Sequence, residues 1–338
     1  MTSTEIVADV ATAVRLVEGE AGVLDVVRAV GRLGPASIRS VSRETELPVP
    51  LVSAICNELR RRDVVAREPP VRLTAFGLDL FGDVNGRRAF APRCRRCRGR
   101  GLDLPRALDS VIGELRALAE AAPPPRVEID QCHCTVETKV RRVLAMYDAG
   151  ALGGRRVLVL GDDDLTSVAV RLVAERLGRP AALRGLTVVD VDPEVVTFVD
   201  DALRGSRFGV AVVAHDLREP LPPGFAGAAD TVFTDPPYTN AGAELFLSRA
   251  AEAIGGRTGR DVFLAFGARR PDEALALQRA ILAMGFVVRR LVPNFNEYLG
   301  AGVRGGTSHL YQLRTTSQLR PLVAGRHDGP LYTGDGAS

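Results

Sequence analysis

Short apolar runs alternate with amphipathic segments between residues 126 and 316. Apolar runs of this kind, each followed by apolar positions at helical spacing, are typical of buried strands joined by helices. Seven strands are expected, at residues 157–160, 186–189, 208–213, 230–234, 262–266, 287–291 and 310–314. The pattern predicts an α/β fold in which a Rossmann-like, seven-stranded sheet lies between two layers of helices.

Residues 1–82 have a different pattern. Apolar residues recur at helical spacing in four segments, and two short apolar segments follow. Helices are expected at 5–17, 23–33, 37–45 and 50–62, and strands at 64–67 and 71–74. This order predicts a winged-helix-like domain. Residues 50–53 offer few groups that could contact base edges, so nucleic acid is not expected as a partner, and a dimerisation or lid module is favoured.

Composition marks the remaining boundaries. Arginine and glycine are dense between residues 87 and 106, and three prolines follow an expected helix at 107–121, which predicts a connector over residues 83–128. The Rossmann-like catalytic domain is then expected over residues 129–316. Residues 317–338 end in small and polar residues, which predicts a flexible tail.

The 338 residues carry a formal net charge of +3, and Lys139 is the only lysine. Because the arginines are spread along the chain, the charge does not indicate a nucleic-acid surface. No apolar run reaches the roughly 18 residues of a membrane span, and the N-terminus lacks the basic start of a signal peptide. We therefore expect a cytoplasmic protein without a membrane partner, in which the cysteines are reduced.

Three consecutive acids, Asp162, Asp163 and Asp164, follow the first expected strand and Gly161. Nucleotide-binding folds usually place glycines here. Three adjacent carboxylates repel one another, and a bound cation such as a sulfonium or a polyamine would offset the cost. Capping of the next helix is an alternative explanation, although one acid would suffice for it. The pattern predicts a site for a cationic ligand.

Acids also follow the next two strands. Asp190 or Asp192 is placed to bind the hydroxyls of a ribose, and Asp216 to bind an adenine amino group. These residues predict that the ligand contains a nucleoside.

The fourth strand leads into Asp235-Pro236-Pro237-Tyr238. This sequence resembles the Asp/Asn-Pro-Pro-aromatic signature of S-adenosylmethionine-dependent amino-methyltransferases, in which the first residue and a proline carbonyl hold the attacking nitrogen. A Pro-Pro turn that merely ends a strand is the alternative. An amine that attacks a carbon next to a sulfonium must present its lone pair, and such a cage would orient and desolvate it.

Six blocks resemble, in order and spacing, the branched-chain polyamine synthase family, also called N4-bis(aminopropyl)spermidine synthase. They are Asp130-Gln131, Thr135 to Thr138, Gly161 to Ser167, Asp216 to Arg218, Thr234 to Pro237 and Asn294 to Tyr298. The resemblance covers most of the chain. It implies a class I methyltransferase-type fold, a homodimer, and aminopropyl transfer from decarboxylated S-adenosylmethionine to an amine of spermidine, which releases methylthioadenosine.

The same resemblance implies roles for individual residues. Asp162 and Asp164 would hold the acceptor cation, one of them as base, and Asp235 would hold the attacking nitrogen. The expected donor-binding residues are Gly161, Asp163, Asp190, Asp192, Asp216 and Pro236. The expected acceptor-binding residues are Tyr238, Asn296 and Glu297.

Two departures from the family pattern keep other functions open. Tyr238 stands where family members often carry Glu, which favours an amine methyltransferase that uses intact S-adenosylmethionine. The carboxylate of that donor would meet the acids at residues 162–164, however, and this favours the decarboxylated donor. A polyamine-sensing, DNA-binding regulator is a further alternative.

The second departure is the cluster Cys132-His133-Cys134. Together with Cys94 and Cys97 it supplies four thiols, which could form a tetrahedral zinc site. Other ligands, or buried cysteines without a metal, are the alternatives.

Overall fold

The structure is a computed structural model that describes residues 2–85, 94, 97, 99–300 and 305–336. The chain forms two compact units. The first comprises Met1–Cys94, Ala268–Arg270 and Gly300–Thr307, and the second comprises Arg95–Gly267, Pro271–Leu299 and Ser308–Ser338. Two short segments of the C-terminal half therefore belong to the N-terminal unit.

The first unit is mainly helical. Its helices are α1 (Ser3–Ala13), α2 (Gly19–Leu33), α3 (Ile38–Thr45), α4 (Val49–Arg61) and α5 (Ala75–Asn85). All four predicted helices are present, and α5 was not predicted. The expected hairpin is reduced to isolated bridges, Val65 to Leu73 and Ala36 to Val71. One apolar core, which includes Val26, joins the helices.

The second unit contains a seven-stranded sheet in the order β3-β2-β1-β4-β5-β7-β6. The strands are β1 (Arg156–Leu160), β2 (Gly185–Asp190), β3 (Val210–Ala214), β4 (Thr231–Thr234), β5 (Asp261–Phe266), β6 (Phe286–Glu297) and β7 (Thr307–Thr315). The first five strands are parallel, and β7 runs antiparallel to β5. Strand order reverses at β1, which lies between β2 and β4, so the predicted Rossmann-like sheet is confirmed.

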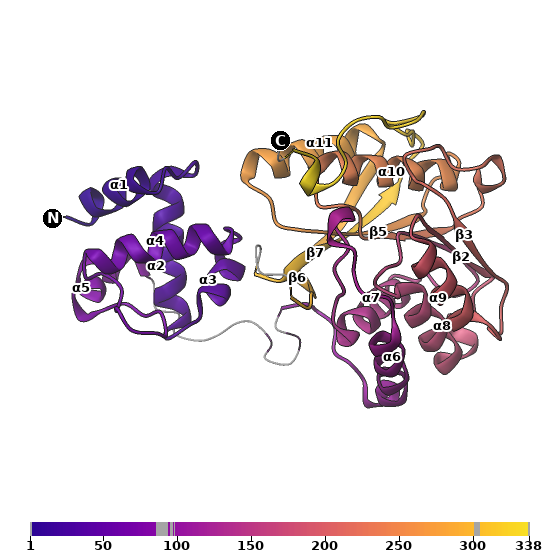
Figure 1. The fold of residues 1–338 in the computed structure, drawn as a ribbon, viewed down its shortest axis with the longest axis horizontal. Helices are drawn as coiled ribbons and strands as arrows, with labels where there is room; N and C mark the ends of the chain where they lie inside the picture. Colours follow the sequence, from indigo (N-terminus) through magenta and orange to yellow (C-terminus); the bar gives the residue numbers. More distant parts are fainter. Residues whose placement is uncertain (1, 86–93, 95–96, 98, 301–304, 337–338) are drawn as a thin grey trace. The chain divides into compact units, whose positions relative to one another are not determined.

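Helices cover both faces of this sheet (Figure 1). They are α6 (Asp109–Ala121), α7 (Val136–Asp148), α8 (Thr166–Leu177), α9 (Pro193–Leu203), α10 (Asn240–Ile254) and α11 (Pro271–Ala283). Alternate side chains of β1 enter different cores: Val157 and Val159 pack with α6 to α9, and Leu158 and Leu160 pack with α10 and α11. Within the described residues, no helix combines the length and the apolar character that crossing a membrane requires.

The predicted flexibility of the tail is wrong for the described residues 317–336. Leu331 is buried in the core beside α10. The Arg249 guanidinium on α10 donates hydrogen bonds to the carbonyls of Val323 and Gly325. The Thr239 hydroxyl donates to the Leu331 carbonyl. These contacts fix the segment along α10 and α11 (Figure 1).

Candidate active site

The predicted site lies at the carboxyl ends of β1 and β4. Because Leu160 and Thr234 are register partners in these parallel strands, Gly161 and Asp235 leave the sheet at the same edge. Gly161 adopts φ +72°, and a Cβ added there would lie 3.4 Å from the Phe246 ring. A left-handed turn in this small space favours glycine.

Arg142 on α7 connects the two strand ends, and the sequence analysis missed it. Its guanidinium is fully buried and donates to Asp164 Oδ2 at 2.8 Å and to Asp235 Oδ2 at 2.6 Å. It also donates to Asn296 Oδ1 at 2.8 Å and to the Tyr298 hydroxyl at 3.0 Å. One buried cation therefore sets the positions of both acids.

Asp164 has internal counter-ions. Lys139 Nζ lies 2.6 Å from its carbonyl oxygen and 3.3 Å from its carboxylate, and Arg142 binds the other carboxylate oxygen. Burial opposes the charged form, but these two cations outweigh burial and hold the pKa of Asp164 well below its usual range. The protein itself therefore supplies counter-charge for this acid, and binding of a ligand cation by Asp164 stays a prediction.

Asp162 binds the first turn of α8. Its buried carboxylate accepts the Ser167 backbone N–H at 3.1 Å and the Ser167 hydroxyl. Burial raises its pKa to about 7. The capping explanation thus describes Asp162, whose oxygens are used inside the protein.

Asp163 differs from both neighbours because it is half-buried. One oxygen accepts the Cys132 N–H at 3.1 Å. Burial, and then the negative charges of Asp164, Asp190 and Asp235, raise its pKa well above the usual range. Among the three consecutive acids, Asp163 is the best placed to take a proton from a ligand.

Asp235 keeps one oxygen available. Its Oδ2 accepts from Arg142 and, at 2.6 Å, from the Tyr298 hydroxyl. Its Oδ1 is buried and has no hydrogen-bond partner among the described residues. Burial raises the pKa of Asp235 to about 6. An unsatisfied buried acceptor costs about 1–3 kcal/mol, so a donating ligand would be stabilised here.

Tyr238 lies next to Tyr298 at the end of the β4 loop. Its N–H donates to Asp130 Oδ2 at 3.2 Å, and its ring meets the Tyr298 ring edge to face, with centroids 6.1 Å apart. Pro236 is buried. The Pro237 carbonyl accepts the Thr239 N–H at 2.7 Å and is used within the turn.

Residues 132–135 run antiparallel to residues 297–299. The Thr135 N–H donates to the Glu297 carbonyl, and the Leu299 N–H donates to the His133 carbonyl, each at 2.8 Å. This pairing aims the backbone N–H groups of Cys132 and Cys134 at Asp163 and Asp164. The backbone of the cysteine cluster therefore contacts the acids.

The zinc prediction is corrected by the same geometry. Burial raises the pKa of Cys132 to about 12 and also raises that of Cys134, which opposes the thiolate form. Over the part of the chain that the structure describes, which includes Cys94 and Cys97, no group of three or more His, Cys, Asp or Glu side chains is arranged to hold a metal ion. A zinc site formed by these four cysteines is not supported.

Two predicted acceptor-binding residues have internal partners. Asn296 is fully buried, and its Nδ2 donates to Ser308 Oγ at 2.8 Å and to the His309 carbonyl at 3.1 Å, while its Oδ1 faces Arg142. Glu297 is half-buried and forms a 2.7 Å ion pair with Arg100. Asn296 therefore positions other residues of the site.

The acids predicted to bind a nucleoside lie along the neighbouring strand ends. Asp190 accepts the N–H groups of Asp162 at 2.6 Å and Asp192 at 2.8 Å. Asp192 Oδ1 accepts the Glu194 N–H at the start of α9. Asp216 is exposed after β3. These acids follow the sheet order away from β1, as a nucleoside crevice requires.

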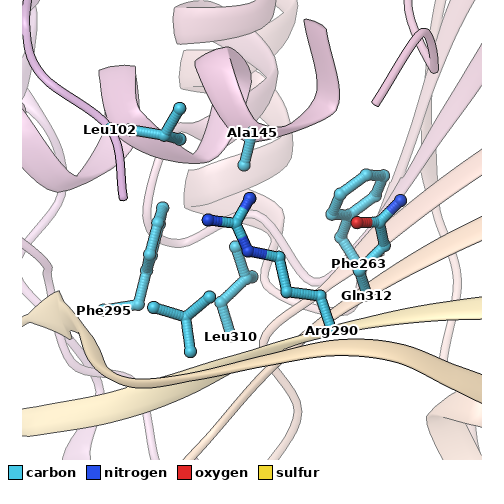
Figure 2. A pocket seen from close by; sticks show the side chains of 8 residues that line it. Leu102, Ala145, Phe263, Arg290, Phe295, Leu310 and Gln312 are labelled. Atoms are coloured by element: carbon cyan, nitrogen blue, oxygen red, sulfur yellow. The ribbon is translucent and has the colours of Figure 1, made fainter. Parts of the chain in front are cut away.

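A separate small pocket lies between α7 and the β5–β7–β6 side of the sheet (Figure 2). Its lining residues are Leu102, Ala145, Phe263, Arg290, Val292, Phe295, Leu310 and Gln312. None of them is a predicted site residue, so this pocket is distinct from the carboxylate cluster.

A family model described as the branched-chain polyamine synthase A C-terminal domain matches residues 110–318. The chain belongs to this family. The branched-chain polyamine synthase resemblance predicted from the motifs is thereby confirmed. The match spans α6 to β7 and so includes every acid of the site.

Relatives match over more of the chain. The N(4)-bis(aminopropyl)spermidine synthase of Thermus thermophilus is 31% identical over 97% of this chain and 90% of its own length. An uncharacterised protein of Methanocaldococcus jannaschii is 33% identical over 90% of this chain and 76% of its own length. The crystal structure of the Thermus thermophilus branched-chain polyamine synthase, in complex with N4-aminopropylspermidine and 5'-methylthioadenosine, matches with a TM-score of 0.77, 27% identity and 99% coverage of both chains.

Proposed function

We propose that this branched-chain polyamine synthase transfers the aminopropyl group of decarboxylated S-adenosylmethionine to an amine of a polyamine such as spermidine, and releases methylthioadenosine. The observation that carries the proposal is the free, buried Oδ1 of Asp235 at the strand edge that also holds Asp163. The names and bound ligands of the relatives support the same reaction.

The reaction needs an oriented amine and a proton acceptor. The acceptor nitrogen attacks the carbon bonded to the sulfonium, a C–N bond forms, the C–S bond breaks, and its electron pair stays on sulfur. Asp235 Oδ1 accepts a hydrogen bond from the nitrogen and orients its lone pair. Asp163 takes the proton that the nitrogen loses, because it lies in the same loop and its pKa is raised by burial and by the neighbouring acids. Asp162 and Asp164 position this loop.

The donor occupies the crevice beside β2 and β3. Asp190 and Asp192 lie toward its ribose and Asp216 toward its adenine, while Gly161 and Pro236 allow close approach. Tyr238 and Glu297 lie toward the rest of the acceptor. The amino-acid carboxylate of intact S-adenosylmethionine would meet the charges of Asp163 and Asp235, which disfavours that donor.

The sequence predicted the first unit to be a winged-helix-like domain, and we assign this unit an assembly role in a homodimer. Light scattering should then give twice the chain mass. Retention on DNA that weakens with salt, and that Arg60→Ala with Arg61→Ala abolishes, would instead support a regulator.

The function is tested by incubating the protein with spermidine and either donor, followed by mass analysis of the amine and the nucleoside. A gain of one aminopropyl group with methylthioadenosine is expected. A one-carbon gain with S-adenosylhomocysteine would identify a methyltransferase. Asp235→Asn should abolish the gain, and Asp200→Asn, an exposed acid on α9, serves as the matched control.

A further inference from the structure

The Tyr298 hydroxyl contacts four polar groups, one of which is the Tyr238 side chain, which forms a hydrogen bond with it. Asp235 Oδ2 is 2.6 Å away, Ser308 Oγ is 2.9 Å away, and Arg142 Nη2 is 3.0 Å away. Tyr298 and Ser308 are buried, at 8% and 1% exposure. The polar groups of this cluster therefore satisfy one another, and the direction of each hydrogen bond can be derived from which atoms carry protons.

The orientation of the Asn296 amide sets the donor-to-acceptor direction of these hydrogen bonds. Because Arg142 Nε donates to Asn296 Oδ1, the amide nitrogen must face the other way, and it donates to Ser308 Oγ. Ser308 accepts there, so its own proton is available for the Tyr298 oxygen. Arg142 can only donate.

The Tyr298 oxygen thus receives hydrogen bonds from Ser308 and Arg142. Its single proton is left for Asp235 Oδ2, which lies closer than Ser308 Oγ or Arg142 Nη2. Burial raises the pKa of Tyr298 well above its usual range, so the hydroxyl remains a donor at any working pH.

We propose that Tyr298 is a positioning residue: its hydroxyl is the last donor of a one-way hydrogen-bond chain that saturates one oxygen of Asp235 and turns the other toward the acceptor nitrogen. This inference rests on the proposed function for its catalytic consequence. The geometry itself does not depend on the identity of the substrate.

Several charged or titratable groups face Asp235. They are Arg142 on α7, Asp163 and Asp164 after β1, Cys132 and Cys134 in the antiparallel segment, and the two tyrosines, Tyr238 and Tyr298. Lys139 on α7 pairs with Asp164. Burial raises the pKa of Asp235, whereas Arg142 and the Tyr298 hydrogen bond lower it, and the result is about 6. Removal of the Tyr298 hydroxyl should therefore raise this pKa further.

The first test compares the pH dependence of kcat/KM in wild type and Tyr298→Phe. We expect kcat to fall about tenfold or more and the acidic limb to move to higher pH, with an unchanged KM for the donor. Ser308→Ala removes the bond to the Tyr298 oxygen and one acceptor of Asn296 Nδ2, which keeps its bond to the His309 carbonyl. It leaves the Tyr298 hydroxyl in place and should cause a smaller shift in the same direction. Tyr147→Phe, an exposed tyrosine at the end of α7, is the matched control and should leave the profile unchanged.

The second test needs no turnover. A carboxyl whose folded pKa is raised stabilises the fold at low pH and loses that contribution as pH rises through the folded pKa. The decline of Tm with pH should therefore extend to higher pH in Tyr298→Phe than in wild type. If wild type transfers no aminopropyl group but this difference appears, the proposed function fails and the hydrogen-bond chain stands. A Tyr298→Phe protein that matches wild type in both the rate profile and the Tm profile would overturn the inference.

Discussion

The loops after β1 and β4 are both acidic and end neighbouring strands, yet their carboxylates are used differently. After β1, Asp162 binds a helix turn and Asp164 binds two internal cations, which leaves Asp163. After β4, Asp235 has one oxygen saturated and one free. The comparison teaches that the number of acids at a strand edge overstates the number of sites that a ligand cation can occupy.

The largest effect is expected for Asp235→Asn, which removes the free anionic oxygen of the β4 loop while keeping the size of the side chain. Turnover should fall about a thousandfold or more, because both orientation and charge are lost. Rates are measured at saturating donor and acceptor, and a Tm close to that of wild type shows that the fold is intact. A fall of less than tenfold would remove Asp235 from the reaction.

Arg142→Leu should break the link between the two loops. It leaves Asp164 and Asp235 buried without this cation, which costs about 3–5 kcal/mol of unfolding free energy. Arg257→Leu, which breaks an ion pair with Asp230 near the other end of β4, is the control. Urea unfolding gives the stability of each variant. Arg142→Leu should also lose activity per folded molecule, and the control should keep it. If Arg142→Leu keeps the wild-type activity per folded molecule, the link between the loops has no role in the reaction.

The activity of wild type should fall as pH decreases through about 6. Asp235 must be ionised to accept a hydrogen bond from the amine, and its pKa is raised to about 6. The midpoint of the acidic limb of the pH profile should therefore lie at about pH 6 or higher. A profile of kcat/KM from pH 5 to 9 measures this limb. Full activity at pH 5 would show either that the pKa of Asp235 is not raised or that the reaction does not need its ionised form.

The smallest effect is expected for the cysteine cluster. Because its backbone rather than its thiols contacts the acids, Cys132→Ala should change turnover less than threefold, by analogy with ordinary surface substitutions. Treatment with a zinc chelator should leave the rate unchanged. Loss of one zinc per chain together with activity would restore the metal hypothesis.

The sequence predicted the sheet and the strand-edge acids because short apolar runs and the residues that follow them are local signals. It did not assign partners to the acids, since those come from α7 and from the end of β6, distant in the chain. Lys139, the only lysine in an arginine-rich chain, with Arg142 one turn later, was a signal that could have indicated buried counter-ions.

The tail shows the same limit. Its composition suggested flexibility, yet Leu331 and the carbonyls of Val323 and Gly325 find partners on or beside α10. A few scattered apolar residues and two backbone acceptors leave little trace in composition. Long-range partners therefore decide both where the tail packs and which acids remain available to a ligand.

We propose that Asp163, and not Asp162, faces the ligand from the β1 loop. The most direct test compares Asp163→Asn with Asp162→Asn for aminopropyl transfer to spermidine at saturating donor, with Tm measured for both. We expect Asp163→Asn to lower turnover about a hundredfold or more with little change in Tm, whereas Asp162→Asn should mainly lower Tm. Loss of turnover confined to Asp162→Asn would contradict this proposal.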